Sequence, residues 1–214
     1  MNYYIIEMDL VDSRNMEQRS VFQQKLYHFL ESLSNTYQDT LLFPITIILG
    51  DEWRVVCKEG RYLYEIYLKI TNFLDQLNLS CYAGFAYGSL EQPLMNCSTL
   101  TGDAITSSQK ALQYAKSSKN AYQKVVNKNC FVYSIGFRHD EIINLFLQNN
   151  ALLKQKLTQK QKEVIALYEQ YGSYSKMQKS THLSKSTISE RLITANYNLI
   201  KQNDEILMQL FQNN

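Results

Sequence analysis

The chain has 214 residues, 45% of them hydrophobic and 20% charged, a globular composition that excludes a predominantly disordered protein. This length allows one large domain or two small ones. Formal net charge is only +2, but residues 1–153 hold 13 basic and 15 acidic side chains, whereas residues 154–214 hold nine and five. The C-terminal part is therefore the better candidate for binding an anionic polymer.

Four cysteines lie far apart and form no CxxC pair: Cys57, Cys81, Cys97 and Cys130. Three of them sit in apolar, strand-like segments, so we expect reduced thiols in a core and no zinc site. The N-terminus lacks the charged and apolar regions of a secretory signal, and no apolar run approaches membrane-spanning length. We therefore expect a cytoplasmic protein without a membrane partner.

Hydrophobic periodicity divides the first part of the chain into alternating strands and helices. It predicts strands over residues 3–9, 45–49, 53–57 and 79–87, and helices over about residues 15–36 and 63–77. This β-α-β-β-α-β order is the split βαβ pattern of ferredoxin-like sheets. Gly84 and Gly88 in the fourth strand mark positions where backbone or a ligand approaches closely.

A polar loop (91–101), a third helix (about 103–118) and a fifth strand (130–135) follow, and Gly136 marks the end of the first domain. Residues 137–153 form an amphipathic connector.

Acidic residues fall at two neighbouring positions of this expected sheet. Asp9 ends the first strand, and Asp51 and Glu52 follow Gly50 in the hairpin between the second and third strands. The topology places the end of the first strand next to this hairpin, so Asp9 and Asp51 are expected to converge, with Glu52 as a third ligand. Carboxylates are the oxygen ligands that Mg²⁺ prefers, which predicts a magnesium site. The alternative is that these carboxylates are simply solvated.

Basic side chains near this edge are candidates for binding the phosphates of a nucleotide. Lys110 and Lys116 lie on the third helix, and Arg14 lies just after the first strand, where a helix N-terminus favours an anion. An exposed helix face is an equally good interpretation of the two lysines.

The segment after Leu157 has the pattern of a helix-turn-helix. Thr158 and Gln161 form a capping-box pattern at the start of one helix, and Gly172 ends it. A short helix over 174–181, a turn at 182–184 and a further helix from Lys185 complete the motif.

Amines and hydroxyls near the second and third of these helices are suited to phosphate and base-edge contacts. The DNA-binding candidates are Lys176, Lys185, Ser186, Thr187, Ser189 and Arg191. Gln178 stands where the motif normally has a small residue, and His182 replaces the usual turn glycine, so a protein-interaction or dimerisation module is the alternative. Apolar residues at 188, 192, 195 and 199 continue as a seam, which fits either internal packing or a homodimer.

Asp9, the Gly50–Trp53 hairpin (GDEW) and Gly84 resemble the palm-type domain of GGDEF diguanylate cyclases and class III nucleotide cyclases. The stretch Lys110–Asn120 (KALQYAKSSKN) is similar to the late GGDEF helix, whose lysine contacts triphosphate. The whole chain, with its C-terminal helix-turn-helix, most resembles the SatD family of bacterial proteins.

The resemblance implies an α+β protein with a GGDEF/cyclase-like palm domain at 1–136, a helical connector at 137–154 and a helix-turn-helix domain at 155–214. It also implies that Gly50 lies close to a nucleoside triphosphate or cyclic nucleotide. Leu49, however, stands where GGDEF has its first glycine, and a leucine obstructs that approach. Three functions follow: a regulator that senses a nucleotide and Mg²⁺ and binds DNA, a metal-dependent nucleotidyl cyclase-like enzyme, or a catalytically inactive interaction protein.

Overall fold

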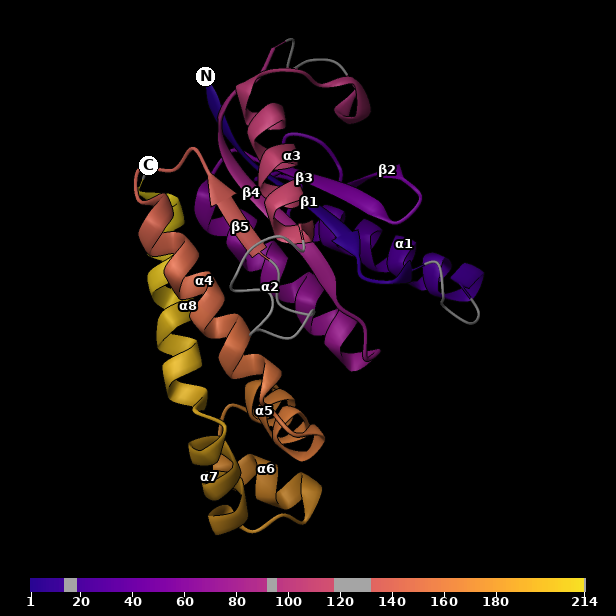
Figure 1. Cartoon of the computed structure of the whole chain (residues 1–214). Helices are drawn as coiled ribbons and strands as arrows, with labels where there is room; N and C mark the ends of the chain where they lie inside the picture. The colour runs from indigo at the N-terminus through magenta and orange to yellow at the C-terminus, as the bar shows by residue number, and fades with distance from the viewer. Residues whose placement is uncertain (14–18, 92–95, 118–131, 214) are drawn as a thin grey trace. The chain divides into compact units, whose positions relative to one another are not determined.

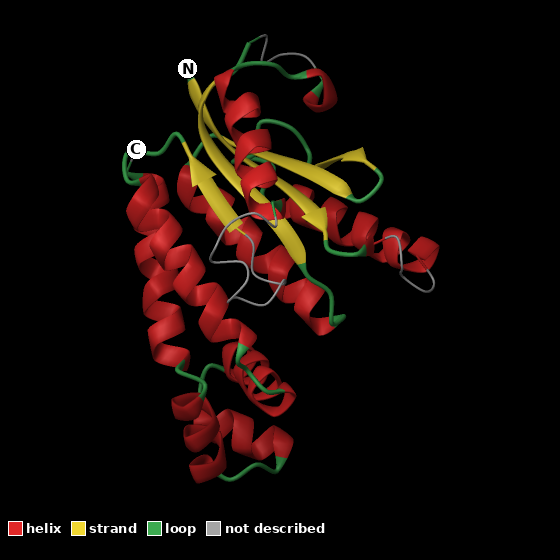
Figure 2. Ribbon diagram, in the orientation of Figure 1, coloured by secondary structure: helices red, strands yellow, loops and turns green. Residues whose placement is uncertain are grey.

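Strands from both halves of residues 1–135 form one mixed sheet in the computed structural model, which describes residues 1–13, 19–91, 96–117 and 132–213 (Figures 1 and 2). In these ranges the sheet has the strand order β2-β3-β1-β4-β5, with β5 parallel to β4 and the other neighbours antiparallel. The strands are β1 (Asn2–Leu10), β2 (Thr46–Leu49), β3 (Glu52–Cys57), β4 (Cys81–Ser89) and β5 (Val132–Ile135). The predicted β-α-β-β-α-β order of the first part is confirmed.

Helices cover both faces of the sheet (Figure 1). Helices α1 (Arg19–Thr36) and α2 (Gly60–Gln76) pack on one face, and α3 (Asp103–Lys116) packs on the other. Because side chains alternate along a strand, β1 sends Ile6 and Met8 to the first face and Ile5 to the second. A short 3₁₀ turn, η2 (Cys97–Thr99), contributes Cys97 to the α3 side.

Gly84 lies directly under α3. A Cβ atom at this position would lie 2.3 Å from the backbone nitrogen of Leu112 and 2.5 Å from the carbonyl oxygen of Ser108. Gly88 has Ala104 nitrogen 3.1 Å from its Cβ position. The close approach that the sequence predicted at these glycines is therefore the backbone of a covering helix.

The last turns of the chain belong to the sheet-containing unit. Residues Met1–Gln148 and Leu207–Asn214 form the first compact unit, and Asn149–Ile206 form the second. Helices α4 (Asp140–Gln155) and α8 (Tyr197–Gln212) each contribute to both. This division differs from the predicted 1–136, 137–154 and 155–214, because Leu207 and Phe211 of α8 are fully buried in the core of the first unit.

The second unit contains α5 (Gln159–Tyr171), α6 (Tyr174–Thr181) and α7 (Lys185–Thr194). The predicted capping box at Thr158 and Gln161 is present, and Gly172 ends α5 in the left-handed conformation. Buried residues from these helices and from the start of α8 form one small core: Val164, Met177, Ile188, Leu192 and Tyr197. The bounds of α6 match the predicted 174–181.

Internal packing accounts for most of the predicted apolar seam. Ile188, Leu192 and Ala195 are buried, whereas Leu199 remains exposed. A homodimer through this seam therefore stays a prediction that rests on Leu199 and its neighbours.

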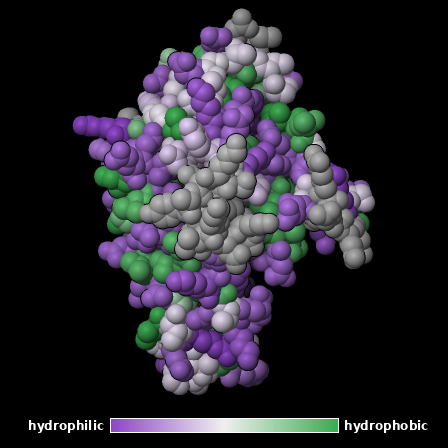
Figure 3. Space-filling model, in the orientation of Figure 1, coloured by the Kyte–Doolittle hydropathy of each residue, from purple (hydrophilic) through white to green (hydrophobic). Residues whose placement is uncertain are grey.

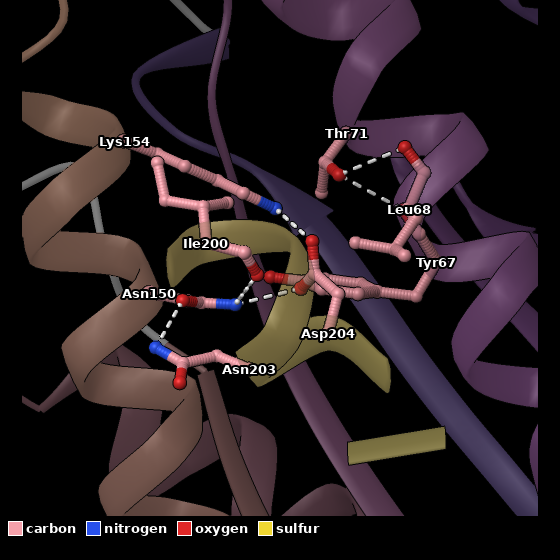
Figure 4. Close-up of polar contacts among 8 residues, drawn as sticks. All are labelled: Tyr67, Leu68, Thr71, Asn150, Lys154, Ile200, Asn203 and Asp204. Carbon is pink, nitrogen blue, oxygen red and sulfur yellow. Dashed lines mark hydrogen bonds and ion pairs between the residues drawn. The ribbon is translucent and has the colours of Figure 1, made fainter. Parts of the chain in front are cut away.

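A polar cluster joins α4 to α8 within the second unit (Figure 4). The Asn150 amide donates to the carbonyl oxygen of Ile200 at 3.2 Å and to Asp204 Oδ1 at 2.7 Å, and Asn203 donates to Asn150 Oδ1 at 2.9 Å. Lys154 Nζ lies 3.3 Å from Asp204 Oδ2. Asn150 and Asn203 are buried, so these bonds satisfy polar groups that would otherwise be desolvated, and they fix the register of the two helices.

Among the described helices, none combines the length and the apolarity that crossing a bilayer requires.

Candidate functional site

Asp9 and Glu52 face each other at the end of the β1–β3 pair, and a lysine from α3 lies between them. The antiparallel register pairs Asp9 with Glu52 directly. Lys116, the last residue of α3, places its Nζ 2.7 Å from Asp9 Oδ2 and 3.7 Å from Glu52 Oε2. The three side chains are between 22% and 34% exposed, so the cluster is reachable from solvent. We call Asp9, Glu52 and Lys116 the strand-end cluster.

A buried ion pair supports this cluster from the interior of the sheet. Two residues before Asp9 and two after Glu52, the register pairs Glu7 with Arg54. Arg54 Nε donates to Glu7 Oε1 at 2.8 Å, and Arg54 Nη1 donates to the carbonyl oxygen of Cys97 at 2.7 Å. Burial raises the pKa of the Glu7 carboxyl, and Arg54 opposes that rise. The Glu7–Arg54 pair and the Asp9–Glu52 pair are therefore neighbouring charged pairs on the side of β1 and β3 that faces α3.

Tyr82 adds a phenol beside the strand-end cluster. It is the register partner of Asp9 on β4. Burial raises the pKa of Tyr82, the carboxylates of Asp12 and Asp9 raise it further, and Lys116 lowers it. The sequence analysis missed Tyr82, although its parity with Gly84 on the α3 side of β4 was a usable signal.

Asp51 has a different partner. Its Oδ1 lies 3.3 Å from Nη2 of Arg19, the first residue of α1. Asp51 precedes β3, and Gly50 before it has φ +61°, the left-handed conformation of a tight turn. The structure thus brings Asp9 together with Glu52, whereas Asp51 pairs with Arg19, which the sequence analysis did not single out.

The predicted phosphate-binding residues separate in the same way. Lys116 belongs to the strand-end cluster, but Lys110 is exposed on α3 with no ion pair among the described residues. Arg14 lies outside the described residues. Leu49 at the hairpin is 78% exposed, so its side chain does not fill the cluster from inside the fold.

The residues present do not fit the predicted three-carboxylate magnesium site. Within the described ranges, no three acidic, histidine or cysteine side chains come together closely enough to hold a metal ion. At the strand-end cluster an ammonium group already lies between the two carboxylates. The cluster therefore holds two carboxylates and one ammonium group, which balances only one of the two negative charges.

The second candidate site is the surface of α6 and α7. Lys176, Lys185 and Ser186 are exposed, and Thr187, Ser189 and Arg191 are half-buried. Ser184 caps α7: its Oγ accepts from Thr187 nitrogen at 3.1 Å and lies 2.8 Å from the Ser186 and Thr187 hydroxyls. Two of the predicted DNA-contacting hydroxyls therefore also order the N-terminus of the helix.

The two departures from the helix-turn-helix pattern have structural explanations. Gln178 is exposed, and Met177 takes the buried position of α6. His182 ends α6 with φ +58°, the left-handed conformation for which glycine is the usual residue.

These features define a class of protein: an α+β chain in which a mixed five-stranded sheet with a charged strand end is followed by a separate helical unit. A model of the SatD family matches residues 3–211, and the chain belongs to that family, as the sequence predicted.

Comparison with curated proteins found no match. Among solved structures, the chain is similar to an adenylate/guanylate cyclase/hydrolase from Silicibacter pomeroyi at 18% identity, with 53% of this chain and 69% of that chain covered and a TM-score of 0.41. That similarity is too distant to transfer any chemistry to the strand-end cluster.

Proposed function

We propose that this SatD-family chain is a regulatory protein whose α5–α7 module is a helix-turn-helix that binds DNA. The observation that carries the proposal is a set of cations on α6 and α7 that lack acidic partners. Among the described residues, no carboxylate lies within 4.0 Å of Lys176, Lys179, Lys185 or Arg191. Residues 154–214 carry nine basic and five acidic side chains, and cations without internal partners are available to phosphate.

The faces of α7 support the same assignment. Ile188 and Leu192 are buried against α5 and α6, which turns Ser186 and Ile193 toward the opposite side of the helix and leaves Ser189 at the edge of the buried face. Serine hydroxyls reach phosphates or base edges, and an apolar side chain such as Ile193 suits the methyl group of thymine. Ile193 is 70% exposed, so it is available to a partner.

Where α6 and α7 lie, the face shown in Figure 3 is mainly hydrophilic, with few strongly hydrophobic residues. A polar, cation-bearing surface favours a nucleic acid over an apolar protein partner.

Fluorescence anisotropy with labelled genomic fragments tests the proposal. We expect a Kd in roughly the micromolar range or weaker at low salt, because few phosphates are neutralised, and affinity should fall as salt is added, with a slope set by that small number. The Lys185→Ala/Arg191→Ala double variant should weaken binding at every sequence. The matched control removes two exposed lysines of the first unit, Lys25→Ala/Lys69→Ala, and should change nothing. No binding by the wild-type chain at low salt would refute the proposal.

A second candidate function is nucleotide sensing by the sheet-containing unit, favoured by the solvent-reachable ammonium of Lys116. A polyphosphate would compete with Asp9 and Glu52 for this cation. Thermal-shift measurements against nucleoside triphosphates, with and without Mg²⁺, test it, since a ligand of the folded state raises the apparent melting temperature. A shift that is lost in Lys116→Met and kept in Lys110→Met supports sensing at this cluster. No shift with any nucleotide leaves the interaction-protein alternative.

A further inference from the structure

We propose that the Lys116 ammonium serves as the cation of the strand-end cluster, so that the native protein needs no divalent ion there. Replacing Lys116 with an uncharged residue should then create a divalent-cation site. This inference is independent of the proposed DNA binding and of any nucleotide, because it concerns the protein with metal ions alone. It starts from the misfit between the predicted three-carboxylate magnesium site and the side chains that the structure brings together.

The position of the ammonium is that of a bridging ion. Its nitrogen contacts Asp9 Oδ2 at 2.7 Å and approaches Glu52 Oε2 at 3.7 Å. A Mg²⁺ ion bound to the same two oxygens would lie about 2.1 Å from each, in the space that the ammonium takes up. A divalent ion and Lys116 would also repel each other strongly at such short range. Ion and lysine are therefore alternatives at this position.

The surroundings hold the lysine in place. Lys116 is in the last turn of α3, where the negative end of the helix dipole favours a cation. Gly84 lets α3 lie against the sheet, and the Glu7–Arg54 pair fixes the neighbouring row of β1 and β3. Because both the helix and the strand row are fixed by packing, the ammonium stays opposite Asp9 without a ligand to recruit it.

Removing the positive charge of Lys116 should allow Asp9 and Glu52 to bind a divalent cation. With methionine at position 116, two carboxylates face each other across β1 and β3 at the negative end of a helix. Their repulsion is relieved by any cation that binds both, and a hard divalent ion is the best fit to carboxylate oxygens. The Arg54 side chain cannot substitute, because it is committed to Glu7 and Cys97.

The test is Mn²⁺ binding to the 214-residue chain, measured from the electron paramagnetic resonance signal of the ion that remains free in solution. We expect Lys116→Met to gain one site that binds Mn²⁺ at least about ten-fold more tightly than anything in the wild type. Lys116→Arg keeps a cation and should behave as the wild type. Lys110→Met makes the same charge change at an exposed position of the same helix and should gain nothing. The gain should disappear in Lys116→Met/Asp9→Asn.

Two results would overturn the inference. One is a wild-type Mn²⁺ site of the same affinity as in Lys116→Met; the other is a folded Lys116→Met variant, judged by circular dichroism, without the gain. If Lys116→Met does not fold, Asp9→Asn in the otherwise native chain decides the question. The inference requires that Asp9→Asn leave Mn²⁺ affinity unchanged, and a loss of affinity would show that the native cluster binds the metal.

Discussion

Arg54 directs two guanidinium nitrogens at a single carboxylate oxygen of Glu7, with Nε at 2.8 Å and Nη2 at 2.6 Å, inside the sheet and away from solvent. The pair lies on the same face of β1 and β3 as the strand-end cluster, one row further in. The same two strands carry the Asp9–Glu52 pair two residues away, so we expect loss of the Glu7–Arg54 pair to loosen the positions of Asp9 and Glu52 as well.

Arg54→Met should destabilise the first unit by about 3–5 kcal/mol at pH 7, because it leaves the Glu7 carboxylate buried without a counter-ion. The Glu7→Leu/Arg54→Met double variant should recover a large part of that loss, since it removes the uncompensated charge. Urea unfolding, monitored by the fluorescence of Trp53, the one tryptophan of the chain, measures the free energy of unfolding of both variants. The exposed charge-matched control Lys69→Met should stay within about 0.5 kcal/mol of wild type. A double variant no more stable than the single one would contradict this account.

The same single variant should also be sensitive to pH. Burial raises the pKa of Glu7 in the folded chain above its ordinary value of 4.5, and Arg54 limits that rise. The folded state therefore binds more protons than the unfolded state above pH 4.5, and stability falls as pH rises toward the folded pKa. Without Arg54 the fall should be larger, so Arg54→Met should lose more stability than wild type between pH 5 and pH 7. Equal losses in urea titrations at the two pH values would contradict the assignment.

Phe211 should contribute to the stability of the first unit although only three residues follow it. Its ring is fully buried and lies 4.7 Å from Phe85 and 4.9 Å from Phe137, measured between centroids. Phe211→Ala should lower the free energy of unfolding of the first unit by about 3–5 kcal/mol. Gln209→Ala, on an exposed turn of the same helix, is the control and should cost little. Trp53 fluorescence during urea unfolding reports the difference, and a Phe211→Ala loss as small as that of the control would contradict the placement of α8.

Gly60 gives an independent test of the same packing. A Cβ atom there would lie 2.0 Å from the carbonyl oxygen of Phe211 and 2.7 Å from the Tyr4 ring. Although alanine is the better helix former, Gly60→Ala should therefore destabilise the first unit, the opposite of the usual sign in a helix.

Local patterns predicted the elements well because they depend on neighbours in sequence. The apolar residues of β1 and the capping box at Thr158 and Gln161 are such local signals, and the structure has both elements. The destination of Phe211 depends on a contact with residues more than a hundred positions away, which periodicity does not encode. The sequence analysis assigned residues 155–214 to one helix-turn-helix domain and so did not place the end of α8 in the core of the first unit.

The sequence predicted part of the strand-end cluster: it placed Asp9 beside the hairpin but did not identify Glu52 and Lys116 as its direct partners. The hairpin was correctly expected next to Asp9, but its register was not fixed by the sequence, and β2 and β3 carry an irregularity between Ile47 and Leu49. A one-residue difference decides whether Asp51 or Glu52 meets Asp9. Spacing likewise could not tell which lysine of α3 faces the sheet. That choice depends on Gly84, which sets where the helix crosses the strands.

A substitution at His182 should increase the stability of the second unit. It has φ +58°, a conformation that costs a non-glycine residue about 1 kcal/mol. His182→Gly should therefore stabilise the second unit by up to about 1 kcal/mol, less the extra freedom that glycine gives the unfolded chain. Thermal unfolding followed by far-ultraviolet circular dichroism measures it. Lys179→Gly, inside α6, is the matched control and should destabilise by about 1 kcal/mol. Destabilisation by both variants would contradict the turn geometry.

Tyr82 provides a spectroscopic report on the strand-end cluster. Burial raises its pKa above 10, Asp12 and Asp9 add to the rise, and Lys116 opposes it. Because the phenolate is negative, Lys116→Met should raise the pKa of Tyr82 further, whereas Asp9→Asn should lower it. The sign for stability follows: the unfolded phenol ionises first, so stability falls as pH rises above about 10, and it should fall further in Lys116→Met.

Carbon-13 chemical shifts of labelled tyrosine, titrated between pH 8 and pH 12, resolve Tyr82 once Tyr82→Phe has assigned its signal. Lys110→Met carries the same charge change on α3 without touching the cluster and should leave the Tyr82 pKa where it is. If Lys110→Met and Lys116→Met shift Tyr82 equally, the effect is one of overall charge. A shift in Lys116→Met alone, opposite in sign to that of Asp9→Asn, requires that the ammonium and the carboxylate act on Tyr82 at short range.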